Sequence, residues 1–175
     1  MNRYNKIIMF VLAAIIFISF FLPWIEVESV VKGGVTKVLT GESQASFLAI
    51  SGFQVPIIAN GPESRLMISI IKLFNPGITN ADKKSYLIWA IPGLAVVISA
   101  IFLFLEKNKW MNLAVAIIGI SIFFVSVFKI MTTNLDKLVL KVNIAIGLWL
   151  IFFAYLGMGL LCLVNLISLF KIKKA

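Results

Sequence analysis

The sequence predicts an all-α membrane bundle of four transmembrane helices, with a small extracytoplasmic β-sheet and a short amphipathic surface helix. Four uncharged stretches each reach the roughly 18 to 20 apolar residues that a helix needs to cross about 30 Å of hydrocarbon. Hydrophobic residues make up 61% of the 175 residues and charged residues 13%, against about 45–50% and 25% in soluble domains. We expect one domain, residues 1–175, with spans at about 7–25, 87–105, 110–128 and 144–170.

The first stretch also has the pattern of a signal peptide, because the basic residues Arg3 and Lys6 precede it. Its apolar centre is at the long end for a signal sequence, and no small-x-small cleavage site follows. The bulky segment Pro23-Trp24-Ile25 follows instead. We therefore expect the stretch to be retained as a helix, with Trp24 as a membrane-interface anchor.

Basic residues indicate how the chain is threaded. With four spans both termini lie on one side, where three short segments hold seven of the sixteen basic residues and the acid Glu106. Dense Lys and Arg in short segments marks the cytoplasmic face, so we expect both termini to be cytoplasmic. The seven are Arg3, Lys6, Lys107, Lys109, Lys171, Lys173 and Lys174.

The composition favours a plasma membrane, most simply a bacterial inner membrane. The chain is rich in Ile, Lys and Asn and has no Asn-x-Ser/Thr sequon. Its last residues, 171–175, also match a dilysine retrieval signal of the endoplasmic reticulum. A basic cap on a cytoplasmic helix end accounts for them more simply.

The outer loop, residues 26–85, has room for a small fold, and its β-branched runs predict an antiparallel sheet. Charged and apolar residues alternate from Ile25 to Glu28, as in a strand, and two runs flank Gly33-Gly34, as in a hairpin. The predicted strands are Trp24–Val31, Val35–Leu39, Phe47–Ile50 continued by Phe53–Ile58, and, in the second outer loop, Leu138–Val142.

A short helix is predicted from Pro62 to about Phe74, because proline favours the first helical position. Arg65, Ser69 and Lys72 fall at i, i+4 and i+7 and form one polar stripe on an otherwise apolar helix. The helix is too short to span the membrane, so it should lie on its surface or over the sheet. Arg65 and Lys72 could contact anionic lipid headgroups, although a plain polar stripe is the simpler interpretation.

Small residues within the spans indicate close helix packing or contacts with a partner helix. They are Ala95 and Ser99 in the second span, Ala114 and Ser121 in the third, and Gly157 and Gly159 in the fourth, near Asn165. Pro92-Gly93 should kink the second span.

The sequence lacks the residues that most catalytic and metal sites need. It has no histidine, which excludes His ligands, His general bases and Ser-His dyads. Its one cysteine, Cys162, lies in an apolar stretch. The spans hold no Asp, Glu, Lys or Arg, whereas pumps and proton-coupled carriers place such groups at membrane depth. We expect no catalytic residue, metal or cofactor.

Two charge features have a functional and a plain interpretation. The net charge of +9 could attract nucleic acid, but basic residues collect at cytoplasmic helix ends in membrane proteins, so we expect no nucleic-acid partner. Glu26 and Glu28 share one face of a predicted strand and could bind a cation or act as an acid–base pair. A solvated strand face is the interpretation we prefer.

The order of elements resembles that of the claudin-like four-helix membrane proteins. The shared layout is a first helix, a strand-rich loop, a short surface helix, two helices with a tight turn, and a last helix. The family's loop signature of Gly-Leu-Trp and two cysteines is absent from the first loop; Gly147-Leu148-Trp149 lies in the last span. Leu22-Pro23-Trp24 and Ser51-Gly52-Phe53 are similar to segments of small prokaryotic membrane proteins.

Two functions follow as expectations. The first is a non-catalytic scaffold or accessory subunit, which binds other membrane proteins or a second copy of itself through its outer loop and helix faces. The second is a lipid- or small-molecule-binding transport accessory protein that uses a cavity between helices.

Overall fold

The computed structural model describes residues 3–29, 47–62, 64–133 and 140–172. The chain divides into two compact units. The helical unit comprises residues 1–19, 89–128 and 150–175, and the sheet unit comprises residues 20–88 and 129–149.

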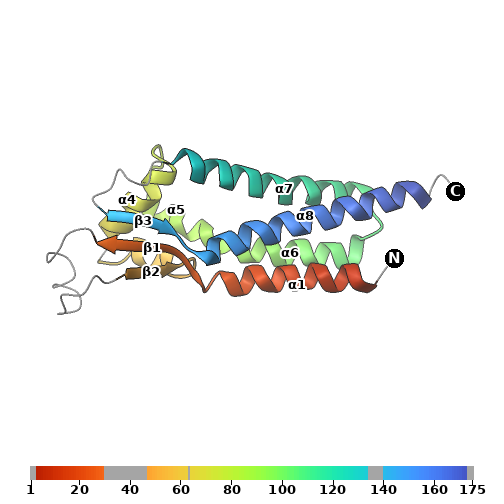
Figure 1. Ribbon diagram of the computed structural model, residues 1–175, viewed down its shortest axis with the longest axis horizontal. Coiled ribbons are helices and arrows are strands. Elements are labelled where there is room, and N and C mark those ends of the chain that lie inside the picture. Colours follow the sequence, from red (N-terminus) through yellow and green to blue (C-terminus); the bar gives the residue numbers. More distant parts are fainter. Residues whose placement is uncertain (1–2, 30–46, 63, 134–139, 173–175) are drawn as a thin grey trace. The chain divides into compact units, whose positions relative to one another are not determined.

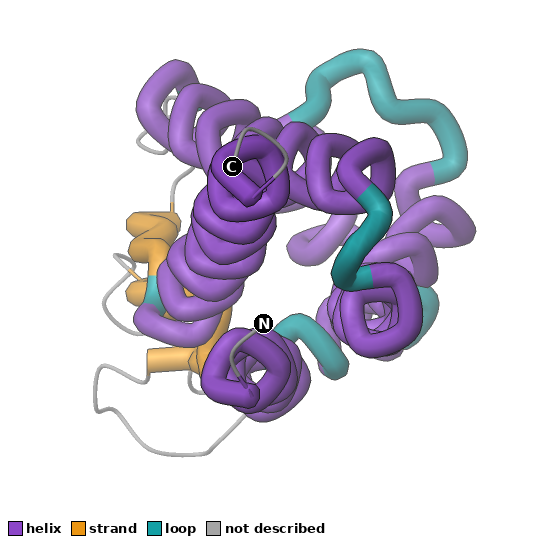
Figure 2. Tube along the Cα trace, turned by 90° about the vertical axis from the view of Figure 1, so that its right-hand side faces the viewer, coloured by secondary structure: helices purple, strands orange, loops and turns teal. Residues whose placement is uncertain are grey.

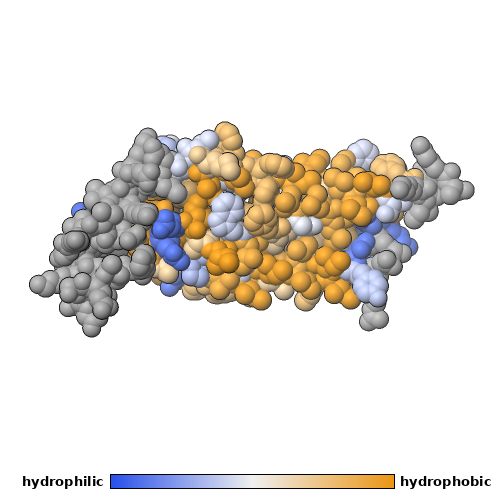
Figure 3. Space-filling model, in the orientation of Figure 1, coloured by the Kyte–Doolittle hydropathy of each residue, from blue (hydrophilic) through white to orange (hydrophobic). Residues whose placement is uncertain are grey.

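Four helices run alongside one another to form the helical unit (Figures 1 and 2). Their apolar side chains cover its surface (Figure 3). The start of α1, the α6–α7 turn and the end of α8 all lie at one end of this unit (Figure 1). The helices are α1 (Arg3–Ser19), α6 (Ala90–Leu105), α7 (Lys109–Thr132) and α8 (Ile146–Ile172).

Three helical stretches are long and apolar enough to cross a membrane: Ala81–Leu105, Lys109–Thr132 and Ile146–Phe170. The first span was predicted to continue to residue 25, but the helix α1 ends at Ser19 and a strand begins at Pro23. Proline cannot donate the next helical hydrogen bond. With 17 residues, α1 is about 25 Å long, which is shorter than the hydrocarbon layer of about 30 Å.

The tight turn between α6 and α7 is stabilised by Asn108. Its Oδ1 accepts hydrogen bonds from the backbone N–H groups of Trp110 (3.0 Å) and Met111 (3.4 Å), which satisfies two of the donors left open at the start of α7. Pro92 is the third residue of α6 and follows the 3₁₀ segment η1 (Ser85–Trp89). Its missing N–H therefore falls where the type of helix changes, in the first turn of α6.

The sheet unit is built on β1 (Pro23–Ser29), which lies between β2 (Phe47–Ser51) and β3 (Leu140–Ile144). Both pairings are antiparallel, with Val27 opposite Leu48 on one side and Val142 on the other. The strands predicted at 24–31, 47–50 and 138–142 are confirmed to within a few residues. The predicted strand 35–39 and its Gly33-Gly34 turn lie outside the described residues.

The prediction that strand structure continues over Phe53–Ile58 is wrong, because Gln54–Ala59 forms the helix α3. Ser51 and Gln54 begin it as a capping box: the Gln54 N–H donates to Ser51 Oγ (3.4 Å), and the Ser51 N–H donates to Gln54 Oε1 (3.0 Å). The sequence Ser-x-x-Gln carried this signal. The strand prediction overlooked it.

The predicted amphipathic helix is confirmed as α4 (Ser64–Phe74). Arg65, Ser69 and Lys72 are exposed, while Met67 and Ile70 are buried. The short helix α5 (Ala81–Lys84) follows it.

Candidate functional site

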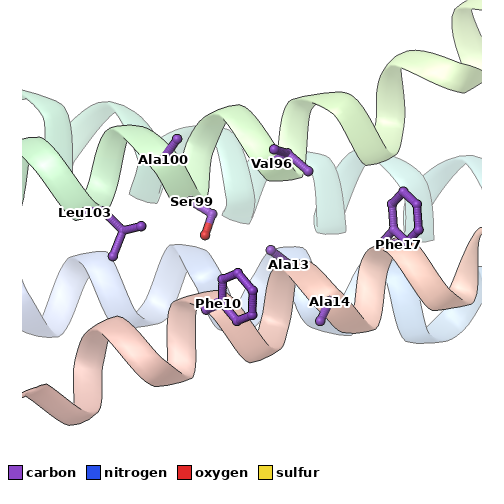
Figure 4. Close-up of a pocket in the computed structure, with 8 residues that line it drawn as sticks. All are labelled: Phe10, Ala13, Ala14, Phe17, Val96, Ser99, Ala100 and Leu103. Atoms are coloured by element: carbon purple, nitrogen blue, oxygen red, sulfur yellow. The ribbon is translucent and has the colours of Figure 1, made fainter.

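A groove of about 340 Å³ lies between α1 and α6 in the helical unit (Figure 4). Ala13 and Ser99 are buried at its base, whereas Phe10, Phe17 and Leu103 are exposed at its rim. Small residues on both helices leave this space, since Ala14 and Ala100 complete the lining together with Val96. The lining of the groove is almost wholly apolar.

Ser99 supplies the one hydroxyl group in the lining of this groove. The residue is only 5% exposed, and its Oγ has no hydrogen-bond partner among the described residues. Its oxygen points into the space between the two helices (Figure 4). A buried hydroxyl without a partner costs about 1–3 kcal/mol, so a ligand with a hydrogen-bonding group at this depth would be stabilised.

A second cavity, of about 610 Å³, lies at the end of α6 and has a partly polar lining. The Lys6 Nζ lies 3.0 Å from Glu106 Oε2, and this ion pair ties α1 to the α6–α7 turn. Lys107 and Asn108 complete the polar lining, and Leu103 lines this cavity as well as the groove.

Buried asparagines hold the same turn from the other side. Asn165 Nδ2 donates to Asn112 Oδ1 and to the Glu106 carbonyl oxygen, each at 2.9 Å. Asn112 Nδ2 donates to the carbonyl oxygens of Glu106 and Asn108, each at 2.8 Å. Sequence reasoning missed the role of Asn112; an amide within an otherwise apolar stretch was the available signal.

Glycines allow α7 and α8 to pack closely. A Cβ on Gly119 would lie 2.5 Å from the Tyr155 carbonyl oxygen and 3.0 Å from the Gly159 Cα. Gly157 lies against Leu12 of α1. Gly157 and Gly159 thus both lie at close approaches between helices, and so does Gly119, which was not predicted from the sequence.

The remaining predicted contact residues are either buried or exposed. Ala95 and Ser99 of α6 are buried, whereas Ala114 and Ser121 are exposed, so the side of α7 that carries them is not covered by the other described helices. In the sheet unit, Arg65 and Lys72 are exposed on α4.

Trp24 is not an exposed interface anchor. It is 5% exposed, and its ring covers Gly52, where a Cβ would lie 2.3 Å from Trp24 Cζ2. Phe20 meets the Trp24 ring edge to face, with 5.7 Å between centroids. The prediction was wrong because a tryptophan at the end of an apolar stretch suits both a membrane interface and a protein core. The sequence alone does not show that the Trp24 ring packs on Gly52.

Glu26 is half-buried on β1, and the side chain of Glu28 lies outside the described residues. The part of the chain that the structure describes holds no group of three or more metal-ligating side chains. Comparisons with protein-family models, curated proteins and solved structures return no match, so the claudin-like layout stays a resemblance.

Proposed function

We propose that this chain is a non-catalytic integral membrane protein that acts as a scaffold or accessory subunit by binding a transmembrane helix of a partner along α7. The observation that carries the proposal is how little of α7 its own unit covers. In the most hydrophobic 18-residue stretch of α7, 17% of the residues are buried, whereas 44% are buried in the corresponding stretch of α8.

The buried residues of α7 are confined to its first half. They are Asn112, Val115, Ala116 and Gly119, and none of residues 120–132 is buried. On the open side, Ala114 and Ser121 are one heptad apart and allow another backbone to approach closely. Large side chains such as Phe124 stand on the same open surface of α7 and would gain dispersion contacts with a partner.

The same proposal includes four membrane crossings with both termini cytoplasmic, in a bacterial inner membrane. Among the described residues, Arg3 and Lys6 lie at the start of α1, Lys107 and Lys109 lie at the α6–α7 turn, and Lys171 lies in the last turn of α8. These three places are at one end of the helical unit (Figure 1). Although α1 is short, the apolar residues Phe20-Phe21-Leu22 follow it, and a bilayer thins locally around a short span at modest cost.

Leucine substitutions on the open side of α7 test the association. Ala114→Leu with Ser121→Leu should release the partner during mild detergent extraction, measured as the mass and stoichiometry of the purified complex, because bulky side chains prevent close packing. Ala90→Leu, at an exposed alanine of α6, is the matched control and should leave the complex intact. A wild-type protein that purifies as a single chain without a partner or second copy would contradict the proposal.

The absence of catalysis is tested separately at the two glutamates. Replacing Glu26 and Glu28 together by Gln should leave any activity of the purified assembly within a few-fold of normal. A large loss of turnover with the assembly intact would point to an enzyme or a cation site instead.

A second function, binding a lipid or small apolar molecule as a transport accessory protein, is favoured by one observation. The groove between α1 and α6 holds a buried hydroxyl, that of Ser99, which has no partner among the described residues. This function does not depend on the open side of α7.

A further inference from the structure

The groove between α1 and α6 must be filled by something when the protein lies in a membrane. Protein interiors and bilayers are closely packed, and an empty space of this size forfeits contacts along its whole lining. Water is a poor occupant, because a bound water needs two to four polar partners and Ser99 is the one polar side chain there. Hydrocarbon is the occupant that the lining favours.

The shape of the groove favours a single chain of methylene groups over a protein helix. A helix with its side chains is about 10–12 Å in diameter, whereas α1 and α6 pack against each other along the groove. The exposed rings of Phe10 and Phe17 stand at its rim and would obstruct a second backbone. An acyl chain is one methylene wide and needs less room than a helix.

The polar end of the groove indicates what the acyl chain is attached to. Leu103 lines both the groove and the second cavity, so the two spaces are neighbours on either side of this residue. There Lys6 and Lys107 supply positive charge beside one carboxylate, that of Glu106. A lysine ammonium donates three hydrogen bonds, so Lys6 can bind Glu106 and an anionic oxygen together.

The spacing between the hydroxyl and the basic end matches a glycerophospholipid. Ser99 precedes Glu106 by seven residues, which is about 10 Å along an α-helix. The polar headgroup region is about 5–8 Å thick in each leaflet, and the stem of a lysine side chain covers the remainder. An ester carbonyl at the top of the acyl chain would therefore come level with Ser99 while the phosphate faces the lysines.

We propose that the α1–α6 groove binds an anionic glycerophospholipid, with one acyl chain running from the level of Ser99 towards Val96 of α6 and lying beside Phe10 and Phe17 of α1. The Ser99 hydroxyl donates to an ester carbonyl of this lipid, and Lys6 and Lys107 bind its phosphate. The inference rests on the second function proposed above, lipid binding, and names the class of lipid.

Photocrosslinking in liposomes tests the site directly. The purified protein is reconstituted in phosphatidylcholine vesicles that contain a trace of phosphatidylglycerol with a diazirine in its acyl chain, and labelled peptides are mapped by mass spectrometry. We expect labelling on residues 10–17 and 96–103 to exceed that on the exposed apolar surface of α8, residues 160–167, which lies outside the side of α7 proposed to bind a partner. Ala100→Leu should fill the groove and remove this excess, whereas Ala90→Leu, at an exposed alanine outside the lining of the groove, should not.

Charge is tested with a variant that leaves the helices untouched. Lys107 is exposed, and Lys107→Gln should weaken competition by unlabelled phosphatidylglycerol about fivefold, since each lysine near an anionic surface contributes about 1 kcal/mol. Lys109→Gln is the matched control, because Lys109 lies over the Phe170 ring (5.4 Å) and lines neither space.

The possible outcomes separate the two levels of the proposal. Equal labelling with a phosphatidylcholine probe would overturn the assignment of the headgroup while lipid binding stands. No excess of labelling in the groove over the exposed surface of α8 would overturn lipid binding itself. A crosslink from a benzoylphenylalanine at position 100 to a co-purified protein would show that a partner helix occupies the groove, and would also overturn the inference.

Discussion

Asn165 donates a hydrogen bond to Asn112 across the helical unit, with 2.9 Å between Nδ2 and Oδ1. Both side chains are buried, and both also hold the Glu106 carbonyl oxygen of the α6–α7 turn. Glu106 in turn pairs with Lys6 of α1. Polar groups thus join α1, α6, α7 and α8 at one end of the helical unit.

Asn165→Leu should therefore destabilise the bundle. It removes two hydrogen bonds and leaves Asn112 Oδ1 buried without this donor; interhelical hydrogen bonds in membranes contribute about 0.6 to 2 kcal/mol each. We expect a lower midpoint of thermal unfolding, followed by size-exclusion chromatography in detergent. Adding Asn112→Leu should recover part of the loss, because it removes the buried Asn112 Oδ1 that has lost its donor, although the Glu106 carbonyl oxygen then loses its second amide donor. Strictly additive effects of the two substitutions would contradict the coupling.

Gly119→Ala should separate α7 from α8. The new methyl group would meet the Tyr155 carbonyl oxygen at 2.5 Å, and backbone cannot move aside as a side chain does. Overpacking of this kind costs about 1–3 kcal/mol. Gly93→Ala is the control, since a Cβ there meets nothing within 4 Å. The midpoint of unfolding should fall for Gly119→Ala alone, and an equal fall for both variants would show that the close approach is unimportant.

Gly52→Ala should disturb the sheet unit through Trp24. The added Cβ would lie 2.3 Å from the indole ring, so the ring must leave its position on β1. Trypsin cleavage of the sheet unit in detergent should speed up. Gly77→Ala, where a Cβ meets nothing within 4 Å, should cleave at the wild-type rate. Because Phe is smaller than Trp, Trp24→Phe should restore part of the resistance to Gly52→Ala; no restoration would place the damage elsewhere.

Cysteine labelling tests the predicted threading. The native Cys162 is buried, so it provides a low background for an impermeant thiol reagent on intact cells. A cysteine at Ser69, which is exposed on α4, should react, and one at Lys109, in the basic turn, should react only after lysis. The physical reason is the density of Lys and Arg around Lys109. Labelling at Lys109 but not at Ser69 on intact cells would reverse the orientation.

The sequence by itself determined the features that depend on neighbouring residues. Long apolar runs predicted the helices, since about 20 such residues in succession have few other uses. Alternation around Glu26 predicted β1, and the Arg65–Ser69–Lys72 stripe predicted α4. These patterns repeat within one element, so no knowledge of distant contacts was required.

Only the tertiary structure decided which residues meet across the chain. Trp24 looked like an interface anchor until Gly52 was seen beneath its ring, and Ala114 and Ser99 looked equivalent until one was found exposed and the other buried. The pairing of β1 with β3 joins segments more than a hundred residues apart, and Gly119 became important through Tyr155 of another helix. Packing between distant segments depends on shape and distance, which a linear pattern of hydrophobicity does not contain.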